Sequence, residues 1–281
     1  MRISFGRAAF RETRGVARQP VSGRDETSEI PRTGTQAIER AVGLLRSFES
    51  DADAELGIME LAARQQLSPS TAHRIARALV AAGLLEQDPD TERYRLGVGL
   101  VELGLLTLQR LGVEAARPLL EALADETGES INLGIRRGDD VMVVLRVSSA
   151  QPLRFEQPAG SRVPIHTSAM GKAILGYSPD PAGEVDRLGG LARLTSHTLT
   201  SRAALKRELQ RTRERGYAVN DEERNLGARA VGAPVLDRCG HAVAAISVQG
   251  PAVRLTERLI PAVASRIQEV APRVAAVLLL A

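Results

Sequence analysis

The segment from residue 57 to residue 96 constrains the fold of this chain more than any other part of its sequence. Its apolar residues recur at helical spacing in two short stretches, which a tight turn separates. Ser68 and Pro69 suit the N-cap and the first position of the second helix, and Gly83 suits its end. Two short apolar segments follow, joined by residues 88–91, whose Pro and Asp residues favour a turn. This order of elements predicts a winged helix-turn-helix.

The polar face of the second predicted helix and the hairpin after it supply candidate DNA contacts. Donors on such a helix can reach phosphates or base edges from the major groove. Arg93 and Arg95 alternate with Tyr94 on the hairpin, so they are expected to point to one side. A further helix expected at residues 35–48 adds one arginine, so the predicted DNA-binding residues are Arg40, Ser70, Thr71, His73, Arg74, Arg77, Arg93 and Arg95. The alternative is a small helical bundle with a solvated polar face, but such a bundle would gain little from the hairpin.

Charge is distributed unevenly in this part of the chain. Residues 35–97 contain seven arginines and ten acidic residues, a net charge of −3. Four of the arginines lie on the second helix and the hairpin, and the acidic residues from 49 to 55 are expected to face away from them. This distribution weakens non-specific binding to a duplex and is compatible with a specific site.

The N-terminal end of the chain has a different composition. The first 34 residues contain seven arginines and four acidic residues and show no periodicity, so residues 1–33 are predicted to be a disordered basic leader. Two interpretations stay open: an arm that follows DNA phosphates, and a flexible extension or misassigned start.

Three further parts complete the predicted organisation, which is of the α+β class. Residues 34–97 form the winged helix-turn-helix domain, in which a first helix capped by Thr35 runs through Phe48. Residues 98–112 are too rich in apolar side chains for a helix buried on one side, so this linker helix needs a partner. Residues 113–281 are expected to form an antiparallel sheet with helices packed on it.

The pattern of the C-terminal part sets the predicted elements. They are a helix from 113 to 127 ended by Gly128, strands at 130–135 and 141–147, a helix capped by Thr200 and running to Arg215, strands at 231–236 and 242–248, and a final helix at 255–280 interrupted by Pro261 and Pro272.

Composition excludes several classes of protein. Of the 281 residues, 43% are hydrophobic, enough for two modest cores. The single cysteine, Cys239, excludes a framework of internal disulfides and fits a reducing compartment. The sequence has no apolar run long enough to span a bilayer and no secretory signal, so a cytoplasmic protein without membrane association is expected. Aromatic residues are too few to stack single-stranded nucleic acid.

Four segments occur in a specific order and spacing: TQAIERAVGLLRSFE, LAARQQLSPSTAHRIARALVAAGLLEQDPDTERYRLG, RVPIHTSAMGKAIL and GYAVNDEERNLGARAVGAPVLDRCGHAVAAISVQGP. Over about residues 34–281 the chain therefore resembles the IclR family of bacterial transcriptional regulators. The resemblance implies a dimerising linker helix and a GAF-like effector-binding domain at the C-terminus. A homodimer, or a dimer of dimers, would place recognition helices in successive major grooves of double-stranded DNA, so a partially palindromic operator is expected.

The same resemblance implies a site for a small carboxylate effector. Its positions here are Ala169, Met170, Asn220, Ala230, Ser247 and Gln249. Characterised members that bind glyoxylate or allantoin-type ligands carry an acid and a cysteine at positions 220 and 230. Asn220 and Ala230 predict a roomier and less acidic pocket, which favours a bulkier carboxylate such as an aromatic-acid catabolite. The alternative, which applies above all to Ala230, is that these positions only pack.

Catalysis and metal binding are not expected. Ser168 and Lys172 are four residues apart, not three as in the serine-lysine motif of β-lactamases, and no serine lies in a GxSxG motif. Cys239 and His241 lack a second pair of ligands for zinc and are expected to lie in a hairpin turn. Lys172 could hold an anion, although a lysine on a helix is more often solvated.

The sequence thus predicts a DNA-binding transcriptional regulator whose operator affinity depends on a small organic acid, without catalytic residues, metal or cofactor. The alternative is a ligand-binding GAF-like module that acts through protein contacts and carries a degenerate DNA domain.

Overall fold

The computed structural model describes residues 33–49 and 55–278. The chain divides into two compact units, Met1–Gly97 and Val98–Ala281. The predicted leader lies outside the described residues, apart from Thr33. Among the described residues, no helix is both long enough and apolar enough to cross a membrane.

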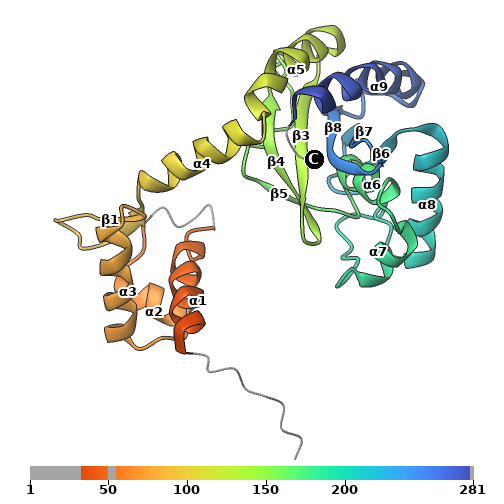
Figure 1. Cartoon of the computed structure of the whole chain (residues 1–281). Coiled ribbons are helices and arrows are strands. Elements are labelled where there is room, and N and C mark those ends of the chain that lie inside the picture. Colours follow the sequence, from red (N-terminus) through yellow and green to blue (C-terminus); the bar gives the residue numbers. More distant parts are fainter. Residues whose placement is uncertain (1–32, 50–54, 279–281) are drawn as a thin grey trace, which may run out of the picture. The chain divides into compact units, whose positions relative to one another are not determined.

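The first unit contains three helices and a hairpin in its described part. They are α1 (Thr33–Arg46), α2 (Ile58–Arg64), α3 (Pro69–Ala81), β1 (Leu85–Gln87) and β2 (Tyr94–Leu96). Its core is made of Leu44, Phe48, Leu56, Leu61, Ala76, Leu79, Leu85 and Tyr94. The start of α3 is as predicted, because the Ser68 hydroxyl accepts a hydrogen bond from the Thr71 amide at 3.3 Å and Pro69 occupies the first turn. The winged helix-turn-helix is therefore present (Figure 1).

The first helix differs from its predicted bounds at both ends. It begins at Thr33, before Thr35, and ends at Arg46, before Phe48. Beyond Arg46 the backbone tightens, since the Ser47 amide is shared between the Gly43 and Leu44 carbonyls and the Phe48 amide bonds to the Leu45 carbonyl three residues earlier. The Ser47 hydroxyl also donates to the Gly43 carbonyl at 3.2 Å, an alternative to the helical bonding pattern.

The hairpin is closed by the turn that its sequence predicts. Leu85 pairs with Leu96 and Gln87 with Tyr94 in an antiparallel register. In the turn, the Asp88 carboxylate accepts from the Asp90 amide and from the Thr91 amide and hydroxyl at 2.8–3.0 Å. These bonds, the Thr91 amide first, hold the pKa of Asp88 below its usual value.

The second unit is built on one antiparallel sheet of the order β5-β4-β3-β8-β7-β6. Its strands are β3 (Ser130–Arg137), β4 (Asp140–Val147), β5 (Arg162–Pro164), β6 (Ala218–Asp221), β7 (Ala228–Leu236) and β8 (Ala242–Pro251). Its helices are α4 (Gly99–Arg110), α5 (Val113–Thr127), α6 (Ala169–Gly176), α7 (Pro181–Arg187), α8 (Arg202–Arg215), the 3₁₀ turn η1 (Glu257–Leu259) and α9 (Ile260–Val277). The α+β class and the antiparallel sheet are as predicted.

Helices cover both faces of this sheet (Figure 1). On one face, α5 and α9 pack on a core that includes Ile131, Ile246 and Val248. On the other, α6, α7 and α8 share a core that includes Val141, Val143 and Ala245. The sheet is thus the middle of three layers, and its strands β7 and β8 are almost entirely buried.

Two helix predictions need correction. The N-cap of α8 is Ser201, not Thr200, whose hydroxyl instead accepts from the Arg193 guanidinium. The final helix is not interrupted: Pro261 lies in the first turn, where no backbone donor is needed, and Pro272 lies inside α9. Buried Val270 and Val274 on either side of Pro272 hold that turn against the sheet, which offsets the lost hydrogen bond. The short elements β5, β6 and α7 were not predicted.

The phenol of Tyr94 gives a test of the first unit. Its ring is 1% exposed, and its hydroxyl has no hydrogen-bond partner among the described residues. Tyr94→Phe is expected to leave stability unchanged or slightly higher, whereas Tyr94→Ala should cost roughly 3–5 kcal/mol because it empties the core. Amide hydrogen exchange in β1 and β2 measures both variants. If Tyr94→Phe and Tyr94→Ala lost protection equally, the Tyr94 hydroxyl would have to form a hydrogen bond that stabilises this unit.

Candidate DNA interface and effector cavity

The recognition helix α3 separates apolar and polar side chains on opposite faces. Ala72, Ala76 and Leu79 are buried, and His73, Arg74 and Arg77 are exposed. Arg74 and Arg77 form no ion pair with any residue that the structure describes. Arg40 on α1, which is partly exposed, is likewise unpaired within the described ranges. These guanidinium groups can therefore bind a phosphate or a base without first breaking an ion pair within the protein.

The hydroxyls at the start of α3 are used in the helix cap. Ser68 Oγ lies 3.2 Å from Ser70 Oγ and 2.8 Å from Thr71 Oγ1. Because each hydroxyl can both donate and accept, Ser70 and Thr71 keep capacity for a base edge.

The wing arginines are already engaged with carboxylates. The Arg93 guanidinium lies 2.9 Å from a Glu60 carboxylate oxygen and also donates to the Glu55 carbonyl at 2.9 Å. Arg95 donates to Glu86 at 3.0 Å and lies 3.7 Å from the Glu55 carboxylate. The expectation that the acidic stretch faces away from these arginines is wrong for Glu55, which both of them approach. Residues 50–54 of that stretch lie outside the described part of the chain.

The six predicted effector residues meet at one cavity in the second unit. It is small, with about 20 Å³ of space, enough for a single water molecule, so the expectation of a roomier pocket is wrong for this structure. Its lining consists of Gln157, Ser168, Ala169, Met170, Asn220, Arg224, Ala230, Ser247 and Gln249. Gln157, Ser168 and Arg224 were not among the predicted effector residues. Gln157 and Arg224 lie in irregular segments, where periodicity gives no signal.

The sheet supplies one wall of this cavity through its register. Asn220 on β6 lies opposite Ala230 on β7, which lies opposite Gln249 on β8. The neighbouring row pairs Gly232 with Ser247. Residues in register or two apart point to the same face of a sheet, so these side chains converge towards α6.

The start of α6 supplies the opposite wall. Ser168 caps the helix, its hydroxyl accepting from the Gly171 amide at 3.0 Å. The amides of Ala169 and Met170 come first in the helix and have no acceptor within it. An N-terminus of this kind favours an anion, through both its amides and the helix dipole.

Gly232 lets this helix approach the sheet closely. A Cβ atom at residue 232 would lie 2.9 Å from the carbonyl carbon of Ala169 and 3.1 Å from its Cβ. Any side chain there would push the start of α6 away from β7. The absence of a side chain at 232 therefore sets the depth of the cavity.

Asn220 presents a hydrogen-bond donor to its surroundings. Its Oδ1 accepts from the Glu223 amide at 2.9 Å, which fixes the orientation of the side-chain amide. The remaining polar atom, Nδ2, can only donate. An aspartate at this position would place an acceptor there instead.

Lys172 is buried, which overturns the expectation that it is solvated. Only 1% of its side chain is exposed, and its ammonium pairs with the Glu223 carboxylate. Burial raises the pKa of Glu223, and the Lys172 charge opposes that shift. Because Lys172 is committed to Glu223, it is not available to hold a ligand.

The other residues that were considered for chemistry have structural partners. Cys239 is exposed in the turn between β7 and β8, as predicted, and both its amide and that of His241 donate to Asp237. Among the described residues, no group of three or more His, Cys, Asp or Glu side chains could hold a metal ion.

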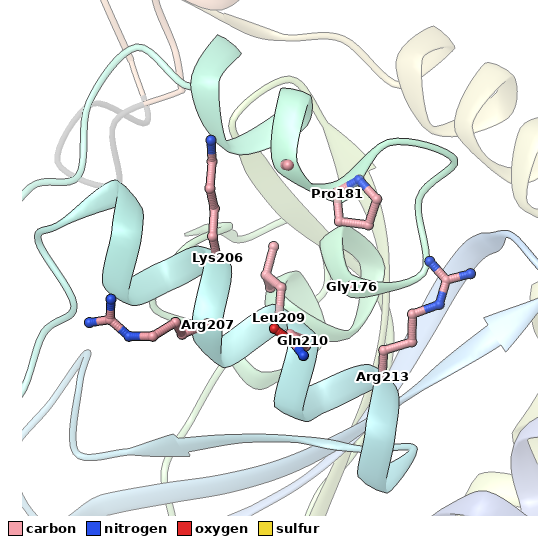
Figure 2. Close-up of a pocket in the computed structure, with 8 residues that line it drawn as sticks. Gly176, Pro181, Lys206, Arg207, Leu209, Gln210 and Arg213 are labelled. Carbon is pink, nitrogen blue, oxygen red and sulfur yellow. The ribbon is translucent and has the colours of Figure 1, made fainter.

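A larger hollow lies elsewhere in the second unit, along α8. It encloses about 750 Å³, open solvent included, and is lined by Gly176, Pro181, Ala182, Lys206, Arg207, Leu209, Gln210 and Arg213 (Figure 2). Figure 2 shows Lys206 and Arg213 on either side of Leu209. Lys206 pairs with Asp186 at 2.7 Å, and none of the predicted effector residues lines this hollow. Size alone therefore does not identify the effector site.

Comparison with known proteins agrees with this architecture. The family model "Bacterial transcriptional regulator IclR C-terminal" matches residues 106–276, and the model "IclR helix-turn-helix domain" matches residues 37–89. The chain belongs to the IclR family of bacterial transcriptional regulators. This IclR-family protein is a DNA-binding regulator with a C-terminal effector-binding domain, and the comparisons give no support to a ligand-binding module with a degenerate DNA domain.

Its similar relatives are themselves regulators. The HTH-type transcriptional regulator BhcR of Paracoccus denitrificans is 37% identical over 240 residues, which cover 85% of each protein. The HTH-type transcriptional repressor AllR of Escherichia coli is 30% identical over 238 residues, covering 83% of this chain and 86% of AllR.

Solved structures share the fold of this IclR-family chain. A transcriptional regulator from Rhodococcus is 28% identical, with a TM-score of 0.75 over 86% of this chain and 98% of that one. An IclR homologue from Microbacterium hydrocarbonoxydans, solved with 4-hydroxybenzoate, is 24% identical with a TM-score of 0.73 over 86% of this chain and 98% of that one. At that identity the second likeness concerns the fold alone.

Arg74 and Arg77 give the first test of the DNA interface. Arg74→Ala and Arg77→Ala should each weaken specific binding by about 1–3 kcal/mol if the residue contacts a base. Arg258→Ala, which removes an exposed arginine of the second unit, serves as the charge-matched control. Electrophoretic retardation of an operator fragment at fixed salt measures all three, and unchanged affinity in both α3 variants would reject this docking face.

His166 gives a test of the second unit through pH. It is 4% exposed, and its Nε2 lies 3.1 Å from the Ala192 carbonyl. Burial lowers the pKa of His166 below 6.5, so the unfolded chain binds more protons as the pH falls below that value, and stability should decrease. His166→Gln should reduce this loss between pH 7.5 and 5.5, and exposed His197→Gln should not. Thermal melts at each pH measure this loss of stability. An equal dependence of melting temperature on pH in wild type and His166→Gln would contradict the role assigned to His166.

Proposed function

We propose that this regulator is a homodimer whose affinity for a partially palindromic operator is changed by a small organic acid in the cavity between α6 and the sheet. One observation carries this proposal. Residues from Gln157 to Gln249 converge there, beside two helix amides that have no acceptor among the residues that the structure describes. Such a concave site with a few convergent polar groups is typical of a ligand pocket.

The polar groups of the cavity favour an anion. The α6 amides donate, and so does the Nδ2 atom of Asn220, because its Oδ1 is held by the Glu223 amide. Ser247, which is 3% exposed, adds a hydroxyl. A carboxylate can accept from several such donors at once.

The cavity is proposed to bind its ligand without transforming it. Ser168 caps α6, and the nearest histidine in sequence, His166, bonds to the Ala192 carbonyl. No base is therefore placed on the Ser168 hydroxyl, as nucleophilic catalysis would need. Ala230 lines this cavity, which holds little more than a water molecule, so a larger acid such as an aromatic carboxylate would have to widen it on binding.

The linker helix supports the proposed dimer. No residue of α4 is buried, and five apolar side chains at or next to it are more than half exposed: Val98, Val101, Leu103, Leu105 and Leu106. A second copy of the helix would cover such a surface. We accordingly propose a leader at 1–33, a DNA domain at 34–97, a linker helix at 98–112 and an effector domain at 113–281, in a protein that acts in the cytoplasm.

The coupling between ligand and DNA gives the decisive experiment. An acid can change operator affinity only if it binds the DNA-competent and incompetent dimers unequally. Ser247→Ala removes a donor, and Asn220→Leu removes the Nδ2 donor together with the bond from the Glu223 amide. Both should abolish the effect of the acid on DNA binding and leave ligand-free affinity within about threefold.

The measurement is a DNA titration with and without glyoxylate, benzoate and 4-hydroxybenzoate as separate probes. Ser265→Ala on the exposed side of α9 is the matched control and should behave as wild type. Unchanged coupling in both cavity variants would place the effector elsewhere. Loss of ligand-free DNA binding would mean that the two residues serve structure alone.

A further inference from the structure

Arg224 is a cation on the cavity wall without a carboxylate partner in the structure. It lines the cavity, and no residue in the described ranges forms an ion pair or a hydrogen bond with its guanidinium. Three other cations of this domain do have carboxylate partners. Lys172 pairs with Glu223, Arg146 with Glu156 at 2.6 Å, and Arg229 with Asp221 at 2.6 Å.

The environment of Arg224 makes this lack of a partner costly. Its side chain is only partly exposed, and burial lowers the pKa of the guanidinium without an acidic neighbour to oppose the shift. An arginine nevertheless stays charged at neutral pH. A charge that is partly withdrawn from water and unpaired is destabilising, and a bound anion would remove that cost.

The backbone around Arg224 is held in place. The Thr195 hydroxyl donates to the Glu222 carbonyl at 2.8 Å, and the Thr198 hydroxyl donates to the Glu223 carbonyl at 2.7 Å. A Glu222 carboxylate oxygen accepts from the Gly227 amide at 2.6 Å. The loop that carries Arg224 is therefore organised before any ligand arrives, which lowers the entropic cost of binding.

A second unused polar group lies on the same cavity. Gln157 is 4% exposed, and its Nε2 atom has no hydrogen-bond partner among the described residues. Buried donors in native proteins are nearly always bonded. Gln157 and Arg224 come from segments 67 positions apart, and both line the same space.

We propose that Arg224 is the charged anchor for the carboxylate of the effector, with Gln157 as an additional donor. This inference rests on the proposed function, because it assumes that the cavity is the effector site. Arg224 supplies the one uncompensated charge among the residues that line the cavity. The site should therefore prefer a monocarboxylate to its uncharged amide, which accepts hydrogen bonds but brings no counter-charge.

The test compares each acid with its neutral amide on the full-length protein by isothermal titration calorimetry. The probes are glyoxylate, benzoate and 4-hydroxybenzoate, each against the corresponding amide. Wild type should bind at least one acid and bind its amide much more weakly. Arg224→Leu should weaken binding of that acid roughly 10- to 100-fold and remove most of the preference over the amide. Arg224→Lys should retain part of the preference, since the charge is kept and the bidentate geometry is lost.

Arg238→Leu, which removes an exposed arginine from the turn after β7, is the matched control and should bind as wild type. A thermal melt at the wild-type temperature shows that the domain of Arg224→Leu is folded. If Ser247→Ala weakens binding of the acid and Arg224→Leu does not, the role of Arg224 as anchor is rejected and the assignment of the cavity as effector site is kept. If wild type binds none of the acids, or if Ser247→Ala binds them with unchanged affinity, the cavity is not the effector site. The proposed role of Arg224 is then rejected as well.

Discussion

The contact between the start of α6 and the backbone of β7 is the constraint on which the effector domain depends. At Gly232 the helix lies so close to the sheet that a single Cβ atom would not fit. This approach brings two amide donors of α6 towards the polar rows of β6, β7 and β8. A helix held one side chain further away would leave the same residues facing a wider, water-filled gap, in which each interaction with an anion is weaker.

Much of the fold could be predicted because local signals agree with the final packing. The cap at Ser68 and the turn at Asp88 are short-range features, and the structure confirms both. The continuous course of α9 through Pro272 could not be predicted, because burial of the flanking side chains decides it. The paired state of Lys172 also depends on a partner 51 positions away, which no local pattern reveals.

The same distinction applies to the candidate site, where residues in regular elements could be predicted and residues in loops could not. The six residues that the sequence resemblance singled out all line one cavity. They could be identified from sequence because they belong to recognisable motifs on regular strands and on one helix. Arg224 and Gln157 lie in loops, where no sequence motif marks them. Their side chains stand out because they have no ion-pair or hydrogen-bond partner among the described residues, and only a three-dimensional structure shows this. In the DNA unit the sequence also overstated the free positive charge, since Arg93 is balanced by Glu60 and Arg95 by Glu86. Specific affinity is therefore expected to depend on the unpaired arginines of α3.

The buried pair between Lys172 and Glu223 joins two walls of the cavity. Lys172 belongs to α6, and Glu223 precedes Arg224 in the loop after β6. The two walls cannot separate without exposing or unpairing buried charges, which is costly. The pair therefore keeps α6 and the loop after β6 at one separation. An effector that changed this separation would have to supply the cost from its own binding free energy, so its measured affinity would be lower than its contacts alone predict.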